Sequence, residues 1–178
     1  MSDLVYDVFE TSLGWVGVLA SPRGVRSSTL PKRSPEAAFE DLDPQARTAR
    51  HAPTSSHIAP VRERIIRFFK GNPVTFTEVQ LDLDGVSPFF RRAWEACRTI
   101  PPGETRTYQW LAAEAGNPKA SRAAGQSMAR NRLAPIIPCH RVVGSDGSLH
   151  GYGGGLALKD HLLTMERKLA AAYTATAR

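Results

Sequence analysis

The chain contains the stretch Ile136-Ile137-Pro138-Cys139-His140-Arg141-Val142-Val143, in which a thiol and an imidazole stand side by side within an aliphatic run. A thiolate rather than a thiol acts as a nucleophile, and its pKa falls from about 8.5 toward roughly 3.5–7.5 beside cationic or imidazole groups. His140 and Arg141 are such neighbours. The stretch therefore predicts a reactive cysteine with a lowered pKa.

The alternative for Cys139 is an inert thiol, because free cysteines are often buried and pack as small hydrophobic groups. Pro138, which restricts how the chain enters the segment, and the two polar side chains after the cysteine favour the reactive interpretation. Adjacent residues of a strand point to opposite faces. If the segment is a strand, we expect His140 to reach the sulfur through a bridging water.

The 178 residues suffice for one domain or for two small ones, and no stretch of about 18 apolar residues could span a bilayer. The start Met1-Ser2-Asp3-Leu4 lacks the blocks of a signal peptide, so we expect an intracellular protein with no membrane partner. Cys97 and Cys139 are too few for a disulfide framework or a four-thiolate zinc site. We interpret Cys97 as core, and a disulfide between the two as an alternative that a reducing compartment disfavours.

Positive charge is concentrated between residues 91 and 141. This span holds nine Lys and Arg residues and three Glu residues, and the difference equals the net charge of +6 of the whole chain. Such a local surplus is typical of a surface that contacts phosphate backbones. The alternative is a basic face that serves only solubility.

The N-terminal half predicts a small antiparallel sheet and a helix. Three strand-like runs, 4–9, 15–20 and 25–30, are separated by turn sequences. Residues 31–60 are rich in Pro, Ser, Thr, Ala and Arg, with one weak helical patch at 35–42, and predict a mobile connection. Val61, Ile65 and Phe69 recur at helical spacing, and the alternation at 79–83 predicts one more strand.

The C-terminal half predicts helices. Ser87-Pro88 is a typical helix start, and the helix behind it ends at Pro101-Pro102-Gly103. Two short helices, 108–115 and 119–129, are separated by Gly116-Asn117-Pro118 and predict a helix-turn-helix. An ordinary helical hairpin is the alternative. A last helix begins near Leu156 and leads into a polar tail over 171–178.

A glycine cluster, Gly151-Tyr152-Gly153-Gly154-Gly155, follows the reactive segment. It lacks the spacing of a P-loop or of the dinucleotide fingerprint. We interpret it as a flexible wall that lets a flat ligand approach the backbone.

Taken together, these motifs resemble the O6-alkylguanine-DNA alkyltransferases. The resemblance covers about residues 87–168 and rests on several motifs in the family's order: Gly116-Asn117-Pro118-Lys119-Ala120, Arg122, Asn131, Pro138-Cys139-His140-Arg141-Val142, Tyr152 and Gly154-Gly155-Leu156-Ala157. It implies an α+β or α/β fold. Residues 1–84 would form a ribonuclease H-like domain with a small antiparallel sheet, and residues 85–170 a mostly helical domain like a winged helix-turn-helix that carries the cysteine.

The resemblance implies repair of DNA by a single, irreversible transfer, in which the O6-alkyl group of an extruded guanine moves to Cys139. His140 would act through water as the base, and Glu166 would hold the imidazole. Tyr108 would donate its phenol proton toward the guanine, and Asn131 would fix the turn beside the site. No cofactor and no metal are implied, and O4-alkylthymine stays open as a second substrate.

The implied partner is double-stranded DNA with an alkylated guanine, bound through the minor groove, where Arg122 would replace the extruded base in the stack. The expected DNA-binding residues are Arg122, Lys119, Ser121, Gln126, Arg130, Arg141, Ala123 and Gly125. The expected pocket residues are Tyr152, Gly153, Gly154, Pro138 and Val142. We expect a monomer in the cytoplasm at the nucleoid, or in a eukaryotic nucleus, with cooperative binding along DNA left open.

Two residues depart from the family pattern. Arg132 follows Asn131 where the family commonly has proline, and Gly153 stands where vertebrate members have serine, so a looser turn and a changed pocket wall are expected. Two other functions stay open. Alkyltransferase-like proteins recognise lesions without transfer but lack the cysteine, and a cysteine hydrolase would need no DNA.

Overall fold

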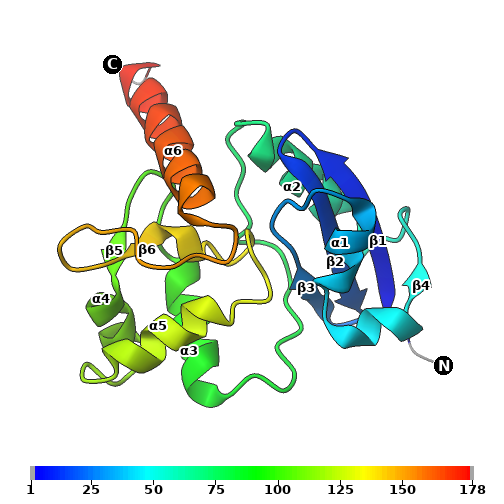
Figure 1. The fold of residues 1–178 in the computed structure, drawn as a ribbon, viewed down its shortest axis with the longest axis horizontal. Helices are drawn as coiled ribbons and strands as arrows, with labels where there is room; N and C mark the ends of the chain where they lie inside the picture. Colours follow the sequence, from blue (N-terminus) through cyan, green and yellow to red (C-terminus); the bar gives the residue numbers. More distant parts are fainter. Residues whose placement is uncertain (1–2, 177–178) are drawn as a thin grey trace. The chain divides into compact units, whose positions relative to one another are not determined.

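The computed structural model describes residues 3–176, which form two compact units (Figure 1). The N-terminal unit comprises Met1–Asp84 and Arg132–Ile136. The C-terminal unit comprises Gly85–Asn131 and Ile137–Arg178. The segment Arg132–Ile136 thus belongs to the first unit although it lies within the second half of the sequence.

The N-terminal unit is built on a four-stranded sheet. Strands β1 (Val5–Thr11), β2 (Gly14–Ser21) and β3 (Gly24–Ser28) form the predicted antiparallel meander. A short strand, β4 (Arg50–His51), pairs in parallel with β1, so the strand order is β3-β2-β1-β4 and the sheet is mixed rather than antiparallel throughout. The α+β class implied by the sequence is confirmed.

Two helices cover opposite faces of this sheet (Figure 1). Helix α1 (Pro35–Glu40) places Phe39 against Tyr6 of β1, with ring centroids 5.0 Å apart. Helix α2 (Ala59–Phe69), which the spacing of its apolar residues predicts, approaches the other face, where Arg62 pairs with Asp7 at 3.0 Å. Consecutive residues of a strand alternate between faces, so Tyr6 and Asp7 face different helices.

Residues 31–60 form ordered structure rather than the irregular connection expected from their composition. Besides α1 and β4, they contain a 3-10 helix, η1 (Pro44–Thr48). Leu42 and Ala46 are buried and pack with Leu19 of the sheet. A few well-spaced apolar residues are enough to anchor a segment whose overall composition is polar.

Arg132, which stands where proline was expected, fastens the inserted segment to the N-terminal unit. Its Nε donates to the carbonyl oxygen of Arg26 at 2.9 Å, and its Nη2 donates to those of Asp82 and Asp84 at 3.3 and 3.1 Å. The expected strand at 79–83 is reduced to a single bridge between Leu81 and Val25. The residues on either side of Leu81 bond instead to β3 and to Arg132.

The C-terminal unit is mostly helical, as the sequence predicts. It contains α3 (Pro88–Arg98), α4 (Tyr108–Glu114), α5 (Ser121–Ala129), the 3-10 helix η2 (Cys139–Arg141) and α6 (Leu156–Thr176). Two short strands, β5 (Arg106–Thr107) and β6 (Val142–Val143), pair with each other in parallel. Helix α6 continues through most of the expected tail at 171–178, and residues 177–178 lie outside the described part.

Helices α3, α4 and α5 are held together by side chains that satisfy backbone groups. Trp94 of α3 donates its indole N–H to the carbonyl oxygen of Ser127 at 2.8 Å, and Arg92 donates to that of Ala115 at 2.7 Å. Gly116 has a positive φ of 95°, a conformation that favours glycine and ends α4 in a tight turn. This turn sets α4 and α5 as the helix-turn-helix pair.

None of the helices among residues 3–176 combines the length and the apolar character that crossing a membrane requires. Within the same residues, no group of three or more His, Cys, Asp or Glu side chains is arranged to hold a metal ion.

Candidate active site around Cys139

Cys139 begins the 3-10 helix η2, where the sequence predicted a strand-like segment. Pro138 has φ −81° and ψ 63°, the geometry of an inverse γ-turn, and the Cys139 N–H donates to the carbonyl oxygen of Ile137 at 2.8 Å. Asn131 donates its side-chain N–H to the same oxygen at 2.9 Å. Asn131 therefore clamps the turn that presents the thiol, and the neighbouring Arg132 does not loosen it.

A hollow of about 670 Å³ opens beside this thiol. It lies entirely within the C-terminal unit, and its volume is typical of a small-molecule site. Its lining residues are Tyr108, Ser121, Arg122, Gly125, Met128, Ala129, Cys139, His150, Gly151, Tyr152 and Gly153. A cysteine that is only 6% exposed thus has access to a cavity large enough for a purine base.

The expectation of a lowered thiol pKa is wrong for the resting site. Burial raises the pKa of Cys139, and a hydrogen bond from Asn131 and the positive charge of Lys159 only partly offset this effect. The thiol is therefore protonated near neutral pH and needs a base before it can react. The guanidinium of Arg141 is paired with the carboxylate of Glu166 instead.

His140 and Glu166 form a buried pair. The Nε2 atom of His140 lies 2.7 Å from Glu166 Oε1, and the side chains are 0% and 1% exposed. Burial lowers the pKa of His140 although Glu166 acts to raise it. Burial acts to raise the pKa of Glu166, but bonds and charges from His140 and Arg141 lower it to about 2. A neutral imidazole thus faces an ionised carboxylate, and Nδ1 carries the basic lone pair.

Arg141, expected to contact DNA, is instead internal. Its Nε and Nη2 donate to the two carboxylate oxygens of Glu166 at 2.9 and 2.8 Å, and its Nη1 donates to the carbonyl oxygen of Ile100 at 2.7 Å. The residue is buried, so its donors do not reach a phosphate. A forked pair of this kind orients the carboxylate that binds His140.

Two phenols and an imidazole form the walls of the hollow. Burial raises the pKa of Tyr108 and raises that of Tyr152 well above its usual range, so both hydroxyls remain protonated donors. His150 packs edge-on against Tyr108 with centroids 5.9 Å apart, and its Nε2 lies 2.9 Å from the hydroxyl of Ser148. A side chain on Gly144 would collide with this imidazole, so the bare glycine provides its space.

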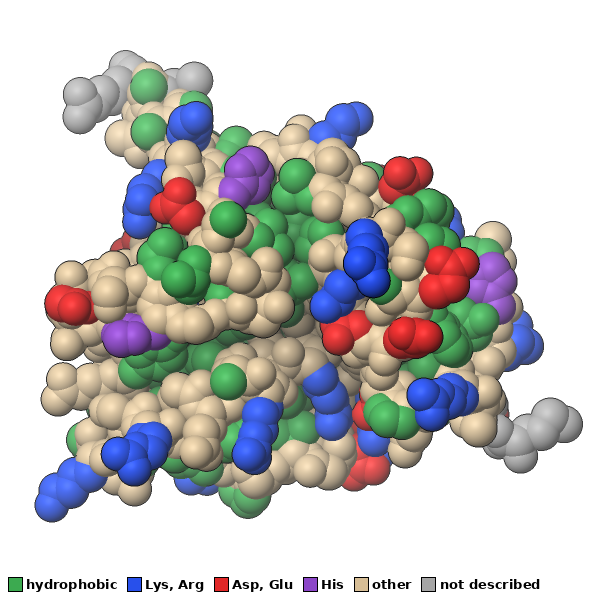
Figure 2. Space-filling model, viewed as in Figure 1, with side chains coloured by type: hydrophobic (Ala, Val, Ile, Leu, Met, Phe, Trp, Pro, Cys, Tyr) green, Lys and Arg blue, Asp and Glu red, His purple; other side chains and the backbone are tan. Residues whose placement is uncertain are grey.

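The other expected DNA-binding residues lie on or beside α5. Arg122, Gln126 and Arg130 are exposed, as is Lys119 just before the helix, whereas Ser121, Ala123 and Gly125 are partly buried. Ser121, Arg122 and Gly125 also line the hollow. Lys and Arg side chains gather over α4 and α5 in the lower left of Figure 2.

Of the expected pocket residues, Tyr152 and Gly153 line the hollow, whereas Gly154 follows them outside its lining. Pro138 and Val142 are buried behind it. Sequence reasoning missed Met128, Ala129, His150 and Gly151 in the lining. It also missed Lys159, whose ammonium group lies next to the two tyrosine rings.

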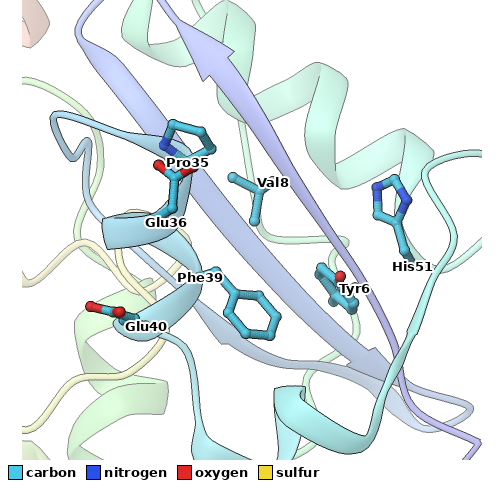
Figure 3. A pocket seen from close by; sticks show the side chains of 7 residues that line it. All are labelled: Tyr6, Val8, Pro35, Glu36, Phe39, Glu40 and His51. Atoms are coloured by element: carbon cyan, nitrogen blue, oxygen red, sulfur yellow. The ribbon is translucent and has the colours of Figure 1, made fainter.

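Another hollow, of about 420 Å³, lies on the N-terminal unit (Figure 3). Tyr6, Val8 and Phe39 supply apolar surface, and Glu36 and Glu40 extend from α1. His51 borders it and bonds to the buried Asp7 at 3.0 Å. Its lining includes no cysteine or other strong nucleophile.

The helix-turn-helix and the thiol beside the hollow are the features of a DNA-binding domain with an active-site cysteine. Residues 88–168 match the family described as "6-O-methylguanine DNA methyltransferase, DNA binding domain". The chain is similar to the methylated-DNA–protein-cysteine methyltransferase of Mycolicibacterium paratuberculosis, at 47% identity over 106 residues. That match covers 60% of this chain and 63% of the relative, which is less than two thirds of its length.

A longer match shows the family. The methylated-DNA–protein-cysteine methyltransferase of Methanosarcina acetivorans is 33% identical over 163 residues, covering 92% of this chain and 98% of the relative. The crystal structure of Mycobacterium tuberculosis O6-methylguanine methyltransferase superimposes with a TM-score of 0.76 at 30% identity, covering 93% of each chain. The structure of M. tuberculosis OGT in complex with DNA gives 0.76 at 32%, covering 92% and 93%. The chain belongs to the family of methylated-DNA–protein-cysteine methyltransferases.

Proposed function

We propose that this protein repairs DNA directly, by moving the alkyl group from O6 of a guanine in duplex DNA to the sulfur of Cys139. The observation that carries the proposal is a thiol at the edge of a base-sized hollow, next to a buried His–Glu pair and to the second helix of a helix-turn-helix. The names of the relatives support the same chemistry.

Activation of the thiol begins with His140. Because its Nε2 proton points at Glu166, its Nδ1 accepts the thiol proton through a bridging water. The imidazolium that forms is stabilised by the carboxylate, whose pKa of about 2 keeps it ionised. Cys139 then attacks the alkyl carbon in line, so that an S–C bond forms as the C–O6 bond breaks.

The departing guanine takes up negative charge, and Tyr108 is placed to stabilise it. Its phenol lines the hollow, and burial keeps its pKa above the usual value. The phenol therefore stays protonated and donates a hydrogen bond toward the purine ring, and the proton that His140 took from the thiol finally neutralises the guanine anion. The thioether on Cys139 is stable to hydrolysis, so each molecule reacts once and requires no cofactor.

Access to O6 requires the base to leave the duplex, because the alkyl carbon cannot be attacked in line within the stack. Arg122 sits near the start of α5, is exposed, and borders the hollow. Its flat cationic side chain suits the space that the base vacates. The small residues Ala123 and Gly125 let α5 approach the minor groove, whose limited sequence information suits a search for damage.

The protein acts on double-stranded DNA that carries an alkylated guanine, and we propose that it does so as a monomer. Helix α5 and the thiol that it borders lie in one compact unit, so that unit contains a complete site. Cooperative loading of several molecules along DNA is compatible with this arrangement.

The test is transfer of a radiolabelled methyl group from an O6-methylguanine duplex to the protein, with Cys139→Ser as the control. We expect label on the wild-type protein and none on the variant. A protein that binds the lesion tightly without taking up label would instead be a recognition protein of the alkyltransferase-like kind. Turnover of an ester or amide without DNA would indicate a hydrolase.

A further inference from the structure

One edge of strand β1 is paired over only part of its length. Strand β4 pairs with Val5 and Tyr6, and the Ala52 N–H adds a last bond to the carbonyl oxygen of Tyr6 at 2.9 Å. Beyond Tyr6, no strand in the described part of the chain continues this ladder. The edge of β1 is therefore open from Val8 to Glu10.

The main-chain groups of Val8 and Glu10 point toward this open edge. Glu10 stands opposite Trp15 of β2, and Trp15 exchanges both of its main-chain hydrogen bonds with Lys32, at 2.7 Å each. Glu10 is thus in a pair without hydrogen bonds, and so is Val8 two residues earlier, because the two kinds of pair alternate along an antiparallel ladder. No other group of the described residues bonds to these N–H and C=O groups, which are left for an added strand.

The hollow of Figure 3 lies beside this edge, on the face of the sheet that carries α1. Tyr6 and Val8 form its floor from β1, and Pro35 and Phe39 add apolar surface from α1. Alternate residues of a strand share a face, so Glu10 faces the same way as Tyr6 and Val8. A strand added at the open edge therefore directs every second side chain over the hollow.

The rim of the hollow is acidic. Glu36 and Glu40 lie one turn apart on α1 and line the hollow, and Glu10 stands on the same face of the sheet. All three are exposed, and none of them forms an ion pair with another described residue. Arg50 of β4 stands opposite Val5 and so lies on the other face. A cationic side chain above the hollow thus meets carboxylates and two aromatic rings.

We propose that the open edge of β1 and this hollow together bind an extended segment of a partner protein that carries Lys or Arg at alternate positions. The segment adds a strand to the sheet. Its main-chain bonds to Val8 and Glu10 provide affinity, and its cationic side chains, placed over the hollow near Glu36 and Glu40, provide specificity. Acidic or uncharged strands gain no such contacts, so the carboxylates also protect the edge from unspecific pairing.

The test titrates the ¹⁵N-labelled protein at low salt with the peptide acetyl-Thr-Lys-Val-Lys-Val-Lys-Thr-amide and follows the backbone amide signals by NMR. The same peptide with Glu in place of each Lys is the matched control. We expect saturable shifts of the Tyr6, Val8 and Glu10 signals with the first peptide and none with the second. Hydrogen exchange of the Val8 and Glu10 amides should slow on binding, because an added strand gives these N–H groups acceptors.

A charge-reversed protein tests the specificity of the hollow. Glu36→Lys combined with Glu40→Lys should weaken binding of the Lys peptide roughly tenfold, because like charges then face each other. The control combines Glu63→Lys with Glu114→Lys, two exposed positions outside the hollow, and changes the net charge equally. This control should keep most of the affinity. Equal losses in the two proteins would overturn the proposal, because the attraction would then depend on net charge alone.

Three further results would also overturn the proposal. They are the absence of saturable binding, signal shifts confined to other parts of the protein, and unchanged exchange of the Val8 and Glu10 amides. A dimer that forms through this edge and that the peptide does not dissociate would assign the edge to a second copy instead. None of these measurements uses alkylated DNA or the Cys139 thiol, so their outcome is separate from that of methyl transfer.

Discussion

His140 Nε2 lies 2.7 Å from Glu166 Oε1, and Arg141 donates two further hydrogen bonds to the same carboxylate. The fixed carboxylate decides which imidazole nitrogen carries the proton, and burial keeps the imidazole neutral. A neutral base next to a protonated thiol differs from the ready-made thiolate that the sequence suggested. In the proposed reaction, the thiol must therefore transfer its proton to His140 before the sulfur can attack.

The folding stability should fall in acid because of Glu166. Its pKa in the folded protein is about 2, below the ordinary value of 4.5. At pH values between these two, the folded state therefore binds fewer protons than the unfolded state. This contribution, about 3 kcal/mol, is fully present above the ordinary pKa and is lost as the pH falls through the folded pKa. Urea denaturation at several pH values checks it. Glu166→Gln, although less stable, should lack this part of the pH dependence, and equal slopes for both proteins would refute the assignment.

Arg122→Ala should impair repair of duplex DNA far more than reaction with free O6-benzylguanine, because only the duplex requires base extrusion. Extrusion involves a few kcal/mol, so we expect a loss on the order of 10- to 100-fold in duplex and little change with the free base. Rates of Cys139 alkylation with each substrate give the comparison. The matched control is Arg167→Ala, an exposed arginine on α6. Equal losses on the two substrates would rule out the role of Arg122 in extrusion.

His150→Ala should widen the pocket. The imidazole occupies the space above Gly144 and packs against Tyr108, so its removal enlarges the wall toward bulky substituents. We expect the rate with O6-benzylguanine in DNA to rise roughly tenfold relative to that with O6-methylguanine in the same duplex. His161→Ala, another exposed histidine, should leave the ratio unchanged. A constant or reduced ratio in His150→Ala would show that this side chain does not limit substrate size.

The DNA affinity should depend strongly on salt. Lys119, Arg122 and Arg130 are exposed on or beside α5. Three phosphate contacts give a slope of roughly −3 for log K against log salt concentration, and Lys119→Ala should reduce the slope by about one. Fluorescence anisotropy with a labelled duplex measures both slopes. A flat response would show that this basic surface does not contact phosphates.

Local patterns in the sequence predicted most helices and the three-stranded meander, because alternation, helical spacing and capping residues are local signals. These local signals failed where contacts between residues far apart in the sequence determine the structure. Arg141 has the charge of a DNA-binding residue, yet each of its three side-chain nitrogens donates to Glu166 or Ile100 inside the unit. Residues 31–60 have the composition of an irregular connection, but Leu42 and Ala46 anchor them to the sheet.

The candidate site was predictable in its nucleophile and its His–Glu pair, through the motif around Cys139 and the family resemblance. Lys159 was not, because its sequence context is that of any lysine on an amphipathic helix. The one available signal was its spacing of seven from Glu166, which places both on the same helix face. His150 stands in a loop, where no periodicity indicates which way a side chain points.

The most direct test of alkyl transfer is the intact mass of the protein after incubation with excess duplex DNA that contains O6-methylguanine, followed by mapping of the modified peptide. We predict a gain of one methyl group per molecule, located on Cys139, together with an equal amount of restored guanine. An unchanged protein mass, or restoration of more guanine than there is protein, would contradict the account.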